Sequence, residues 1–217
     1  MSNELIQRLA VLDTPAVSDA LDKLGIVGQC AGIMPLDRSF NLAGKAFCIK
    51  YVPANELGGT VGDFVDDLGP DDVAVIDNAG RLDATVWGDL MTTVAKKRGV
   101  AGTVIDGVCR DLDRALEFDY PLFSRGNWMR TGKDRVQLEA IGVPVIIGGV
   151  TVRPGDLLRG DINGVVVVPA ARAEEVIEAA ERIQDIEDSI RAGIKQGAGL
   201  RAARERTGYH RLQTPVS

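Results

Sequence analysis

Apolar residues recur at helical spacing at both ends of the chain. Residues 5–24 follow an amphipathic pattern, with Asp13 and Thr14 as a helix start, so an N-terminal helical unit is expected. A long charged helix is expected over residues 171–195, where apolar side chains again recur at helical spacing. Such a helix at a chain end often packs across a neighbouring subunit, and residues 197–217 after it form a tail with little predictable structure.

Between these helices, short apolar runs separated by Gly, Pro, Asp and Asn predict a sheet of short strands. The expected strands cover residues 42–52, 73–76, 84–86, 101–105, 121–123, 143–147, 150–152, 157–158 and 165–168. Residues 161–164 are typical of a hairpin turn. Shorter helices are expected over residues 90–98, ended by Gly99, and over residues 112–117. The pattern therefore predicts an α/β fold in one domain, residues 1–196.

One βαβ-like segment carries polar residues at two places: the start of its helix and the end of its second strand. Asp89 stands at the start of the helix expected over residues 90–98, and it is expected to be the N-cap because Asp favours that position. Arg110 and Asp111 follow the strand expected over residues 101–105, and ligands of α/β sheets bind outside the carboxyl ends of strands. The segment predicts a crevice with free backbone N–H groups, two carboxylates and a guanidinium.

Each of these residues has a simpler interpretation when taken alone. Asp89 could serve solely as a helix cap, and Arg110 with Asp111 could form a surface ion pair. Their joint arrangement favours a site for a small carboxylic acid, because the N–H groups of Leu90 and Met91 at a helix start can bind an anion. In such a site Arg110 can fork onto a carboxylate or an enolate oxygen, and Asp111 can supply one hard oxygen ligand.

Composition narrows the chemistry that such a site can use. The chain has 217 residues, of which 45% are hydrophobic and 26% charged, enough for one well-cored globular domain. Its single histidine, His210, lies in the Arg-rich C-terminal segment, so histidine relays and multi-histidine metal sites are not expected. If the protein is an enzyme, its catalytic groups are expected to be carboxylates, arginine and backbone dipoles, together with a hard cation such as Mg²⁺ or Mn²⁺.

The cysteines are interpreted as small apolar residues. Cys30, Cys48 and Cys109 are widely separated and odd in number, which indicates neither a disulfide framework nor a structural zinc site. Cys109 keeps a second interpretation as a reactive thiol, because the adjacent cation of Arg110 could lower its pKa.

Charge and hydropathy bear on partners and location. The formal net charge of −6 argues against nucleic acid as the main partner, although the arginines of residues 201–211 are a local exception. Those arginines are interpreted as a solvated face or as partners of the acidic helix before them. The first thirty residues lack a cationic start followed by an apolar core, and no apolar run approaches the length of a membrane span. A cytoplasmic protein without a membrane partner is expected.

Asp89, twenty intervening residues and then Arg110 and Asp111 form a D-X20-R-D string. Further segments follow in order along the chain: residues 16–21, 42–47, 87–90, 99–102, 105–107, 124–126, 154–156 and 164–169. Together they resemble the class II pyruvate aldolases related to 4-hydroxy-4-methyl-2-oxoglutarate aldolase, within the regulator-of-ribonuclease-activity A family. The resemblance covers about residues 5–195, and the ordered set is far more specific than the string alone.

The resemblance implies a fold, an assembly and an activity. The fold would be a swivelling β/β/α-type single domain whose C-terminal helix packs on a neighbouring subunit, in a homotrimer or a dimer of trimers (homohexamer) with sites at subunit interfaces. The activity would be that of a Mg²⁺- or Mn²⁺-dependent aldolase, a carbon–carbon lyase. It would cleave 4-hydroxy-4-methyl-2-oxoglutarate or 4-carboxy-4-hydroxy-2-oxoadipate to pyruvate and a second oxo acid, and it would also decarboxylate oxaloacetate.

The resemblance also assigns roles to matching residues. The acid matching Asp111 ligates the metal, and the arginine matching Arg110 steadies the pyruvyl keto oxygen. The acid matching Asp89 orders a water that transfers protons. Glu187 of a neighbouring subunit, or Asp188 as the second choice, approaches the metal through water. The loop that binds the pyruvyl carboxylate through backbone N–H groups comprises Gly88, Asp89, Leu90 and Met91.

One position departs from the family pattern. Family aldolases usually carry Glu or Asp at the third position after the Arg-Asp pair, whereas this chain has Arg114 there, with Asp113 as the nearest acid. Arg114 places positive charge beside the proposed metal and is expected to weaken metal binding or to change substrate preference. The rival interpretation is a non-catalytic module that regulates ribonuclease E by protein contact and needs no metal. Retention of Asp111 favours the enzyme.

Overall fold

Parallel strands form the centre of the molecule. The computed structural model describes residues 2–55 and 61–207. Its central strands are β2 (Leu42–Pro53), β3 (Asp72–Thr85), β4 (Gly102–Cys109) and β5 (Leu122–Asn127). They lie in the order β5-β4-β3-β2, each parallel to its neighbour. Every residue of β4 is buried, as expected for a parallel strand that is covered on both faces.

Antiparallel strands extend this sheet on both sides. The added strands are β1 (Met34–Pro35) beside β5, β6 (Val136–Ile141) and β9 (Leu157–Asp161) beside β2, and β10 (Gly164–Val168) beside β9. A separate two-stranded ribbon comprises β7 (Val145–Ile147) and β8 (Val150–Val152). The β9–β10 hairpin confirms the turn expected at residues 161–164, whereas β6 was not predicted.

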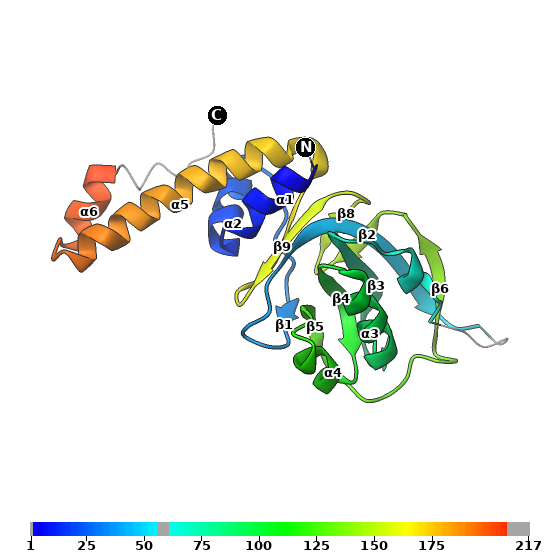
Figure 1. Ribbon diagram of the computed structural model, residues 1–217. Helices are drawn as coiled ribbons and strands as arrows, with labels where there is room; N and C mark the ends of the chain where they lie inside the picture. The colour runs from blue at the N-terminus through cyan, green and yellow to red at the C-terminus, as the bar shows by residue number, and fades with distance from the viewer. Residues whose placement is uncertain (1, 56–60, 208–217) are drawn as a thin grey trace.

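The helices form two groups (Figure 1). The first, α3 (Asp89–Arg98) and α4 (Leu112–Glu117), makes the crossovers from β3 to β4 and from β4 to β5. The second comprises α1 (Ser2–Ala10), α2 (Thr14–Lys23) and α5 (Ala173–Lys195), which pack together beside β9. The 3₁₀ helices η1 (Phe64–Asp67) and η2 (Ala170–Arg172) lie in connections. α5 extends away from the sheet and carries α6 (Leu200–Thr207) near its far end (Figure 1).

The apolar core follows this division into two groups. One buried cluster fills the sheet and the inner sides of α3 and α4, with Val104 and Phe123 among its members. A second cluster lies between the N-terminal helices, α5 and the β9–β10 hairpin, and includes Leu21, Val166 and Ile177. Each cluster removes a continuous apolar surface from water, which is the main favourable contribution to folding.

Hydrogen bonds from polar side chains connect the N-terminal helices to the sheet. The buried guanidinium of Arg159 on β9 donates to the carbonyl oxygens of Leu12, at 2.7 Å, and Leu42, at 3.2 Å. Asp161 at the end of β9 accepts hydrogen bonds from the backbone N–H and the hydroxyl of Thr14, at 2.8 and 2.7 Å. The Asp13 side chain caps α2, as predicted, by accepting the N–H of Ala16 at 2.8 Å, and the start of α2 is thereby held at the hairpin.

The predicted α/β domain with a central sheet and a C-terminal helix is confirmed, but several strand boundaries were wrong, most clearly those of β3 and β4. The strands expected over residues 73–76 and 84–86 are one strand, β3, because left-handed Ala79 and Gly80 (φ 52° and 68°) form an irregularity within it rather than a turn. β4 continues past residue 105 to Cys109. It can do so because the Asp106 carboxylate pairs with Arg125 and accepts the N–H of Gly148 at 2.7 Å.

The tail over residues 197–217, for which the sequence predicted little structure, contains a helix. α6 lies within residues 197–217 and packs against α5, with Ala203 buried. Residues 208–217, including His210, lie outside the described part of the chain. None of the helices described has both the length and the apolar character that a bilayer crossing requires.

Candidate active site

The start of α3 supplies backbone donors to the site. Gly88 is the N-cap, and its carbonyl accepts the N–H of Thr92 at 3.0 Å. The prediction that Asp89 is the N-cap was therefore wrong, because Asp89 is already the first helical residue. Leu90 and Met91 are the second and third residues, whose N–H groups have no acceptor within an α-helix. Among residues 2–55 and 61–207 no hydrogen bond occupies them, so they can serve a ligand.

A buried hydrogen-bond network holds this helix start in place. The Trp87 indole N–H donates to the Thr92 hydroxyl at 2.9 Å, and that hydroxyl donates to the Gly88 carbonyl at 3.0 Å. The Trp87 ring stacks on Tyr120, with centroids 6.2 Å apart and planes 3° from parallel. This role of Thr92 was not predicted, although a Thr one turn after a helix start can bond back to the helix backbone and is a recognisable signal.

The Arg-Asp pair meets the same helix start. Arg110 follows β4, and its N–H donates to the Trp87 carbonyl at 3.0 Å. Asp111 has a left-handed backbone (φ 57°), a conformation that Asp adopts more readily than most residues. Its Oδ2 accepts the N–H of Asp89 at 3.2 Å and lies 3.3 Å from Nε of Arg110. Both contacts engage Oδ2. Among the described residues no contact of Oδ1 is found, so Oδ1 can accept another partner.

Gly88 permits this close approach. A Cβ at this position would lie 2.7 Å from Oδ2 of Asp111 and 3.3 Å from Nε of Arg110. Any other residue would therefore push the Arg-Asp pair away from the helix start.

These groups line one cavity of about 120 Å³. Its lining residues are Val61, Thr85, Val86, Trp87, Gly88, Asp89, Leu90, Met91, Arg110 and Thr131. All five residues predicted to bind the substrate are among them, and Asp111 lies behind them against Asp89 and Arg110. Thr131 was missed because an isolated bridge to Thr85, distant in sequence, brings it there.

Residues 14–167 match a protein family described as RraA-like: Aldolase/RraA. The chain belongs to this RraA-like family. Protein DlpA of Legionella pneumophila is 38% identical over 204 residues, and the match covers 93% of this chain and 33% of DlpA. The chain thus spans about a third of that relative's length. A proposed 4-hydroxy-4-methyl-2-oxoglutarate aldolase of Halalkalibacterium halodurans is 33% identical over 181 residues, 83% of this chain and 84% of the relative.

Solved structures of relatives share the fold. An uncharacterized protein from Pseudomonas syringae pv. tomato has a TM-score of 0.87 and 42% identity, covering 94% of this chain and 98% of that one. RraAS2 of Streptomyces coelicolor, described as an unusual member of the RNase ES inhibitor RraA protein family, has a TM-score of 0.82 and 29% identity. That match covers 87% of this chain and 97% of RraAS2. RraA-like relatives thus include proteins named as aldolases and a protein described as a member of an inhibitor family.

Arg114, at the position where this RraA-like chain departs from the aldolase pattern, is held by its own helix. Its guanidinium pairs with Glu117 and lies 5.4 Å from the centre of the Phe118 ring. Glu117 offsets the charge that was expected to disturb a metal beside Asp111. Asp113, the nearest acid, is exposed.

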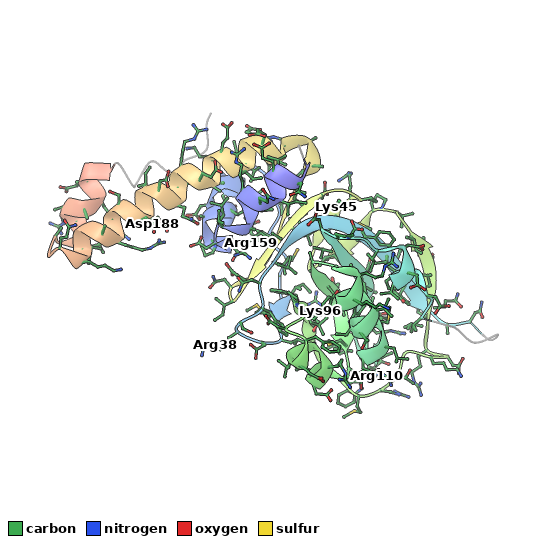
Figure 2. All side chains as sticks on the ribbon, viewed as in Figure 1. Arg38, Lys45, Lys96, Arg110, Arg159 and Asp188 are labelled. Atoms are coloured by element: carbon green, nitrogen blue, oxygen red, sulfur yellow. The ribbon has the colours of Figure 1, made fainter. Side chains whose placement is uncertain are left out.

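The carboxylates predicted to come from a neighbouring subunit lie on the extended part of α5. Glu187 pairs with Arg191 at 2.7 Å, and Asp188 pairs with the same guanidinium. Figure 2 shows Asp188 and Arg110 on well separated parts of the molecule. Within one chain, therefore, Asp111 is the acid that contacts Arg110 beside the cavity. A contribution from Glu187 or Asp188 of another subunit stays a prediction. No cluster of three or more metal-ligating side chains occurs among residues 2–55 and 61–207.

The alternative of a reactive Cys109 was wrong. Its thiol is buried and 3.9 Å from the Gly126 carbonyl oxygen, and burial raises its pKa to about 12. A thiol with so high a pKa stays protonated at neutral pH and is a poor nucleophile. The side chain acts as the small apolar residue that was predicted.

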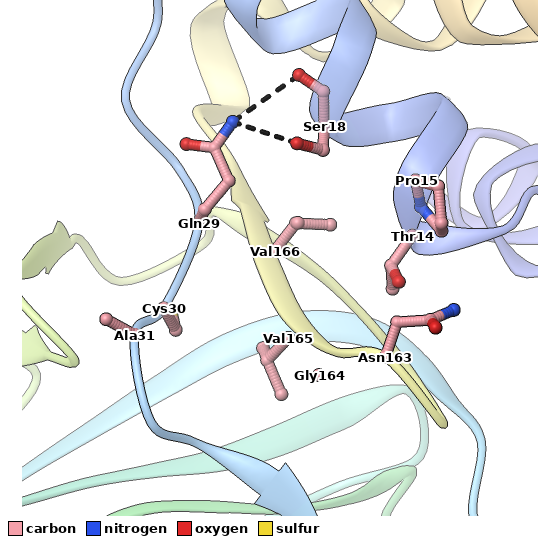
Figure 3. Close-up of a pocket in the computed structure, with 10 residues that line it drawn as sticks. All are labelled: Thr14, Pro15, Ser18, Gln29, Cys30, Ala31, Asn163, Gly164, Val165 and Val166. Atoms are coloured by element: carbon pink, nitrogen blue, oxygen red, sulfur yellow. Dashed lines mark hydrogen bonds between the residues drawn. The ribbon is translucent and has the colours of Figure 1, made fainter.

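A larger cavity of about 330 Å³ lies away from these residues, between α2 and β10 (Figure 3). Its polar side chains bind one another: the Gln29 amide donates to the Ser18 hydroxyl at 3.1 Å, and Asn163 and Thr14 donate to Asp161. The start of α2 is occupied in the same way, because Asp161 accepts the Thr14 N–H. The start of α2 thus differs from the start of α3, because its Thr14 N–H is already paired within the chain.

Proposed function

We propose that this RraA-like protein is a divalent-metal-dependent (class II) aldolase. It cleaves 4-hydroxy-2-oxo acids, such as 4-hydroxy-4-methyl-2-oxoglutarate or 4-carboxy-4-hydroxy-2-oxoadipate, to pyruvate and a second oxo compound, and it decarboxylates oxaloacetate. The supporting observation is the convergence of the α3 start, Arg110 and Asp111 through the Gly88 contact. This arrangement offers complementary groups to both ends of a pyruvyl unit.

Backbone N–H groups and Arg110 bind different parts of the pyruvyl unit. The N–H groups of Leu90 and Met91 receive the substrate carboxylate, which the positive end of the α3 dipole also favours. The Arg110 guanidinium donates to the keto oxygen and stabilises the negative charge that develops there as the C3–C4 bond breaks. Because the bond to Asp89 and the network around Thr92 hold these donors before substrate arrives, little reorganisation is needed.

Asp89 is assigned to the transfer of the C4 hydroxyl proton. Asp89 lines the cavity, and in this proposal its carboxylate orients a water that accepts the proton of the C4 hydroxyl. The electron pair of the C3–C4 bond moves to the pyruvyl unit, C4 becomes a carbonyl, and the proton returns to C3 to give pyruvate. Loss of carbon dioxide from oxaloacetate leaves the same enolate and uses the same donors.

The residues present fit a Mg²⁺ or Mn²⁺ ion. Asp111 offers a hard carboxylate oxygen, Oδ1, and Mg²⁺ in proteins is usually held by one or two carboxylates with waters and substrate oxygens completing its shell. When bound, the ion supplies Lewis-acid stabilisation of charge on the substrate oxygens. Arg110 and the N–H of Asp89 hold the carboxylate in position for that role.

Pyruvate release, coupled to lactate dehydrogenase, tests the proposal. We expect turnover of oxaloacetate and 4-hydroxy-4-methyl-2-oxoglutarate with Mg²⁺ or Mn²⁺ and none with chelator. Asp111→Asn and Arg110→Gln should each lower kcat/KM about a hundredfold or more, because each removes a charge that acts on the reacting oxygen. Asp113→Asn on α4 and Arg182→Gln on α5 are the matched controls, because both side chains are exposed. Wild-type rates in the first pair would refute the assigned roles.

The second candidate is a non-catalytic regulator of a ribonuclease E-type enzyme. The similarity to RraAS2 favours it, and this role needs neither the metal nor the open donors. Inhibition of a ribonuclease by a folded protein that releases no pyruvate under any metal condition would support the regulator. The trimeric or hexameric assembly stays a prediction under either function, to be measured by light scattering.

A further inference from the structure

Thr131 brings a hydroxyl with an uncommitted proton to the candidate site. Two threonines line the cavity, Thr85 and Thr131, and an isolated bridge pairs them. The Thr85 hydroxyl donates to the Arg130 carbonyl oxygen at 3.0 Å. The Thr131 hydroxyl oxygen accepts the backbone N–H of Lys133 at 3.3 Å, and within the described part of the chain no acceptor for its proton is found. Because Thr131 is only half-buried, its O–H can turn toward a ligand in the cavity.

The backbone around Thr131 is held against β3. The Arg130 carbonyl oxygen accepts the N–H of Thr85 at 3.1 Å as well as its hydroxyl. The Thr131 carbonyl oxygen accepts the guanidinium of Arg135 at 3.2 Å. Gly132 follows, and a Cβ there would collide with the Thr85 carbonyl oxygen, so the chain passes β3 more closely than any other residue allows. A fixed backbone therefore presents Thr131 to the cavity, and its hydroxyl needs only a rotation about one bond to donate.

The other polar groups of the cavity already have partners or roles. In the proposed reaction, the α3 start binds the pyruvyl carboxylate, Arg110 the keto oxygen, and Asp89 the water that takes the C4 hydroxyl proton. The Trp87 indole N–H is occupied by the Thr92 hydroxyl. Among the described lining residues, Thr131 is therefore the side-chain donor that has no assigned acceptor. Both substrates named above carry a carboxylate on C4, and no group assigned so far binds it.

We propose that Thr131 is a specificity-determining residue whose hydroxyl donates a hydrogen bond to the carboxylate carried on C4. The inference rests on the proposed aldolase function and narrows its substrates to 4-hydroxy-2-oxo acids with an acidic group on C4. A hydrogen bond to an ionised acceptor is stronger than one between neutral groups. An analogue without that carboxylate leaves the hydroxyl without its acceptor, so the site discriminates against it.

Two substrates that differ in one group on C4 isolate this contact. 4-Hydroxy-4-methyl-2-oxoglutarate carries a carboxylate there, and 4-hydroxy-4-methyl-2-oxopentanoate has a second methyl group in its place. Retro-aldol cleavage of either breaks C3–C4, moves the C4 hydroxyl proton to C3 of pyruvate and leaves C4 as a ketone. The co-product is a second pyruvate from the glutarate and acetone from the pentanoate, so lactate dehydrogenase follows both reactions. Wild-type kcat/KM should favour the glutarate by at least about tenfold.

Thr131→Val tests the donor. Valine keeps the β-branched shape without the hydroxyl, and water can replace the bond that the exposed Lys133 N–H loses. We expect kcat/KM for the glutarate to fall about ten- to a hundredfold and that for the pentanoate to change by less than about twofold. Thr131→Ser keeps the donor and should retain the wild-type preference within about threefold. Equal losses for both substrates in Thr131→Val would mean that the side chain only shapes the cavity.

Thr151→Val is the matched control. Thr151 is exposed on β8 and does not line the cavity, and valine suits a strand, so this variant should keep the wild-type preference. Oxalate, a planar mimic of the pyruvate enolate, should inhibit the wild type and Thr131→Val equally, because it occupies only the pyruvyl part of the site. Weaker inhibition of Thr131→Val would place the hydroxyl at the pyruvyl unit and overturn the assignment to C4.

The same assays separate the role of Thr131 from the aldolase function. Equal cleavage of the glutarate and the pentanoate by the wild type would refute the role of Thr131 without any variant and leave the aldolase standing. Cleavage of the glutarate with an unchanged preference in Thr131→Val would do the same. Failure to release pyruvate from either substrate or from oxaloacetate, with metal present, would refute both proposals.

Discussion

Oδ2 of Asp111 accepts a hydrogen bond from the backbone N–H of Asp89, with 3.2 Å between the two heavy atoms. Asp89 begins α3 and Asp111 precedes α4, so this bond joins the starts of two crossover helices. It occupies the first free N–H of α3 and leaves those of Leu90 and Met91 for a ligand. The contact therefore sets the distance between the proposed carboxylate subsite and the proposed metal ligand.

Gly88→Ala should break this relationship. The new Cβ would lie 2.7 Å from Oδ2 of Asp111 and force the carboxylate away. We expect pyruvate release to fall about a hundredfold, the loss expected for a displacement near 1 Å, while the circular dichroism spectrum stays that of the wild type. Gly199→Ala is the control, because a Cβ there meets no atom within 4 Å. An unchanged kcat/KM in Gly88→Ala would show that the close contact has no part in catalysis.

Much of this site was predictable because local signals define it. Gly99 ends α3 in a left-handed conformation (φ 75°), as its position after the helical pattern indicated. Arg110 and Asp111 follow a buried strand, as predicted, at the end of the sheet where ligands of α/β folds bind. These features depend on residues close together in sequence. The structure has them where they were predicted, except that the N-cap is Gly88 instead of Asp89.

The features that were missed depend on residues far apart in sequence. The Asp106 carboxylate looked like the end of a strand, but a partner nineteen residues later, Arg125, lets it stay inside β4. Thr131 lines the cavity because an isolated bridge pairs it with Thr85. No pattern of apolar spacing encodes such pairings, because each is decided by which surfaces meet in the folded chain.

Thr92→Val should destabilise the start of α3. Valine matches the shape of threonine but removes the hydroxyl, so the buried Trp87 indole N–H loses its acceptor. An unpaired buried donor costs about 1–3 kcal/mol, which urea unfolding monitored by tryptophan fluorescence can measure. Thr93→Val removes a hydroxyl that donates to the Asp89 carbonyl from an exposed position, and water can replace that bond. Equal losses in the two variants would contradict a specific role for Thr92.

Arg114→Gln should change metal activation by less than about threefold. The Arg114 guanidinium pairs with Glu117 and lies over Phe118, so its field at Asp111 is partly neutralised and further screened by solvent. The measurement is the Mg²⁺ or Mn²⁺ concentration that gives half-maximal pyruvate release. A decrease of tenfold or more in that concentration would instead show that Arg114 opposes the metal, as its position in the sequence suggested.

Asp161→Asn should destabilise the protein in a pH-dependent way. Burial works to raise the pKa of Asp161, but hydrogen bonds from Thr14 and Asn163 and the charge of Arg159 outweigh it and lower that pKa below its ordinary value. A carboxyl group with a lowered pKa in the folded state stabilises that state above its unfolded pKa, about 3.9. The stabilisation disappears as the pH falls through the lower, folded pKa.

The free energy of unfolding of Asp161→Asn should therefore lie below that of the wild type at pH 7, and the gap should narrow as the pH falls below about 4. Urea titrations at a series of pH values measure both. Asp67→Asn, at an exposed position of η1, is the control and should show little difference at any pH. A gap that stays constant with pH would mean that asparagine fails through its shape. In that case, the ionised carboxylate of Asp161 would not be what fastens Thr14 and the start of α2 to the β9–β10 hairpin.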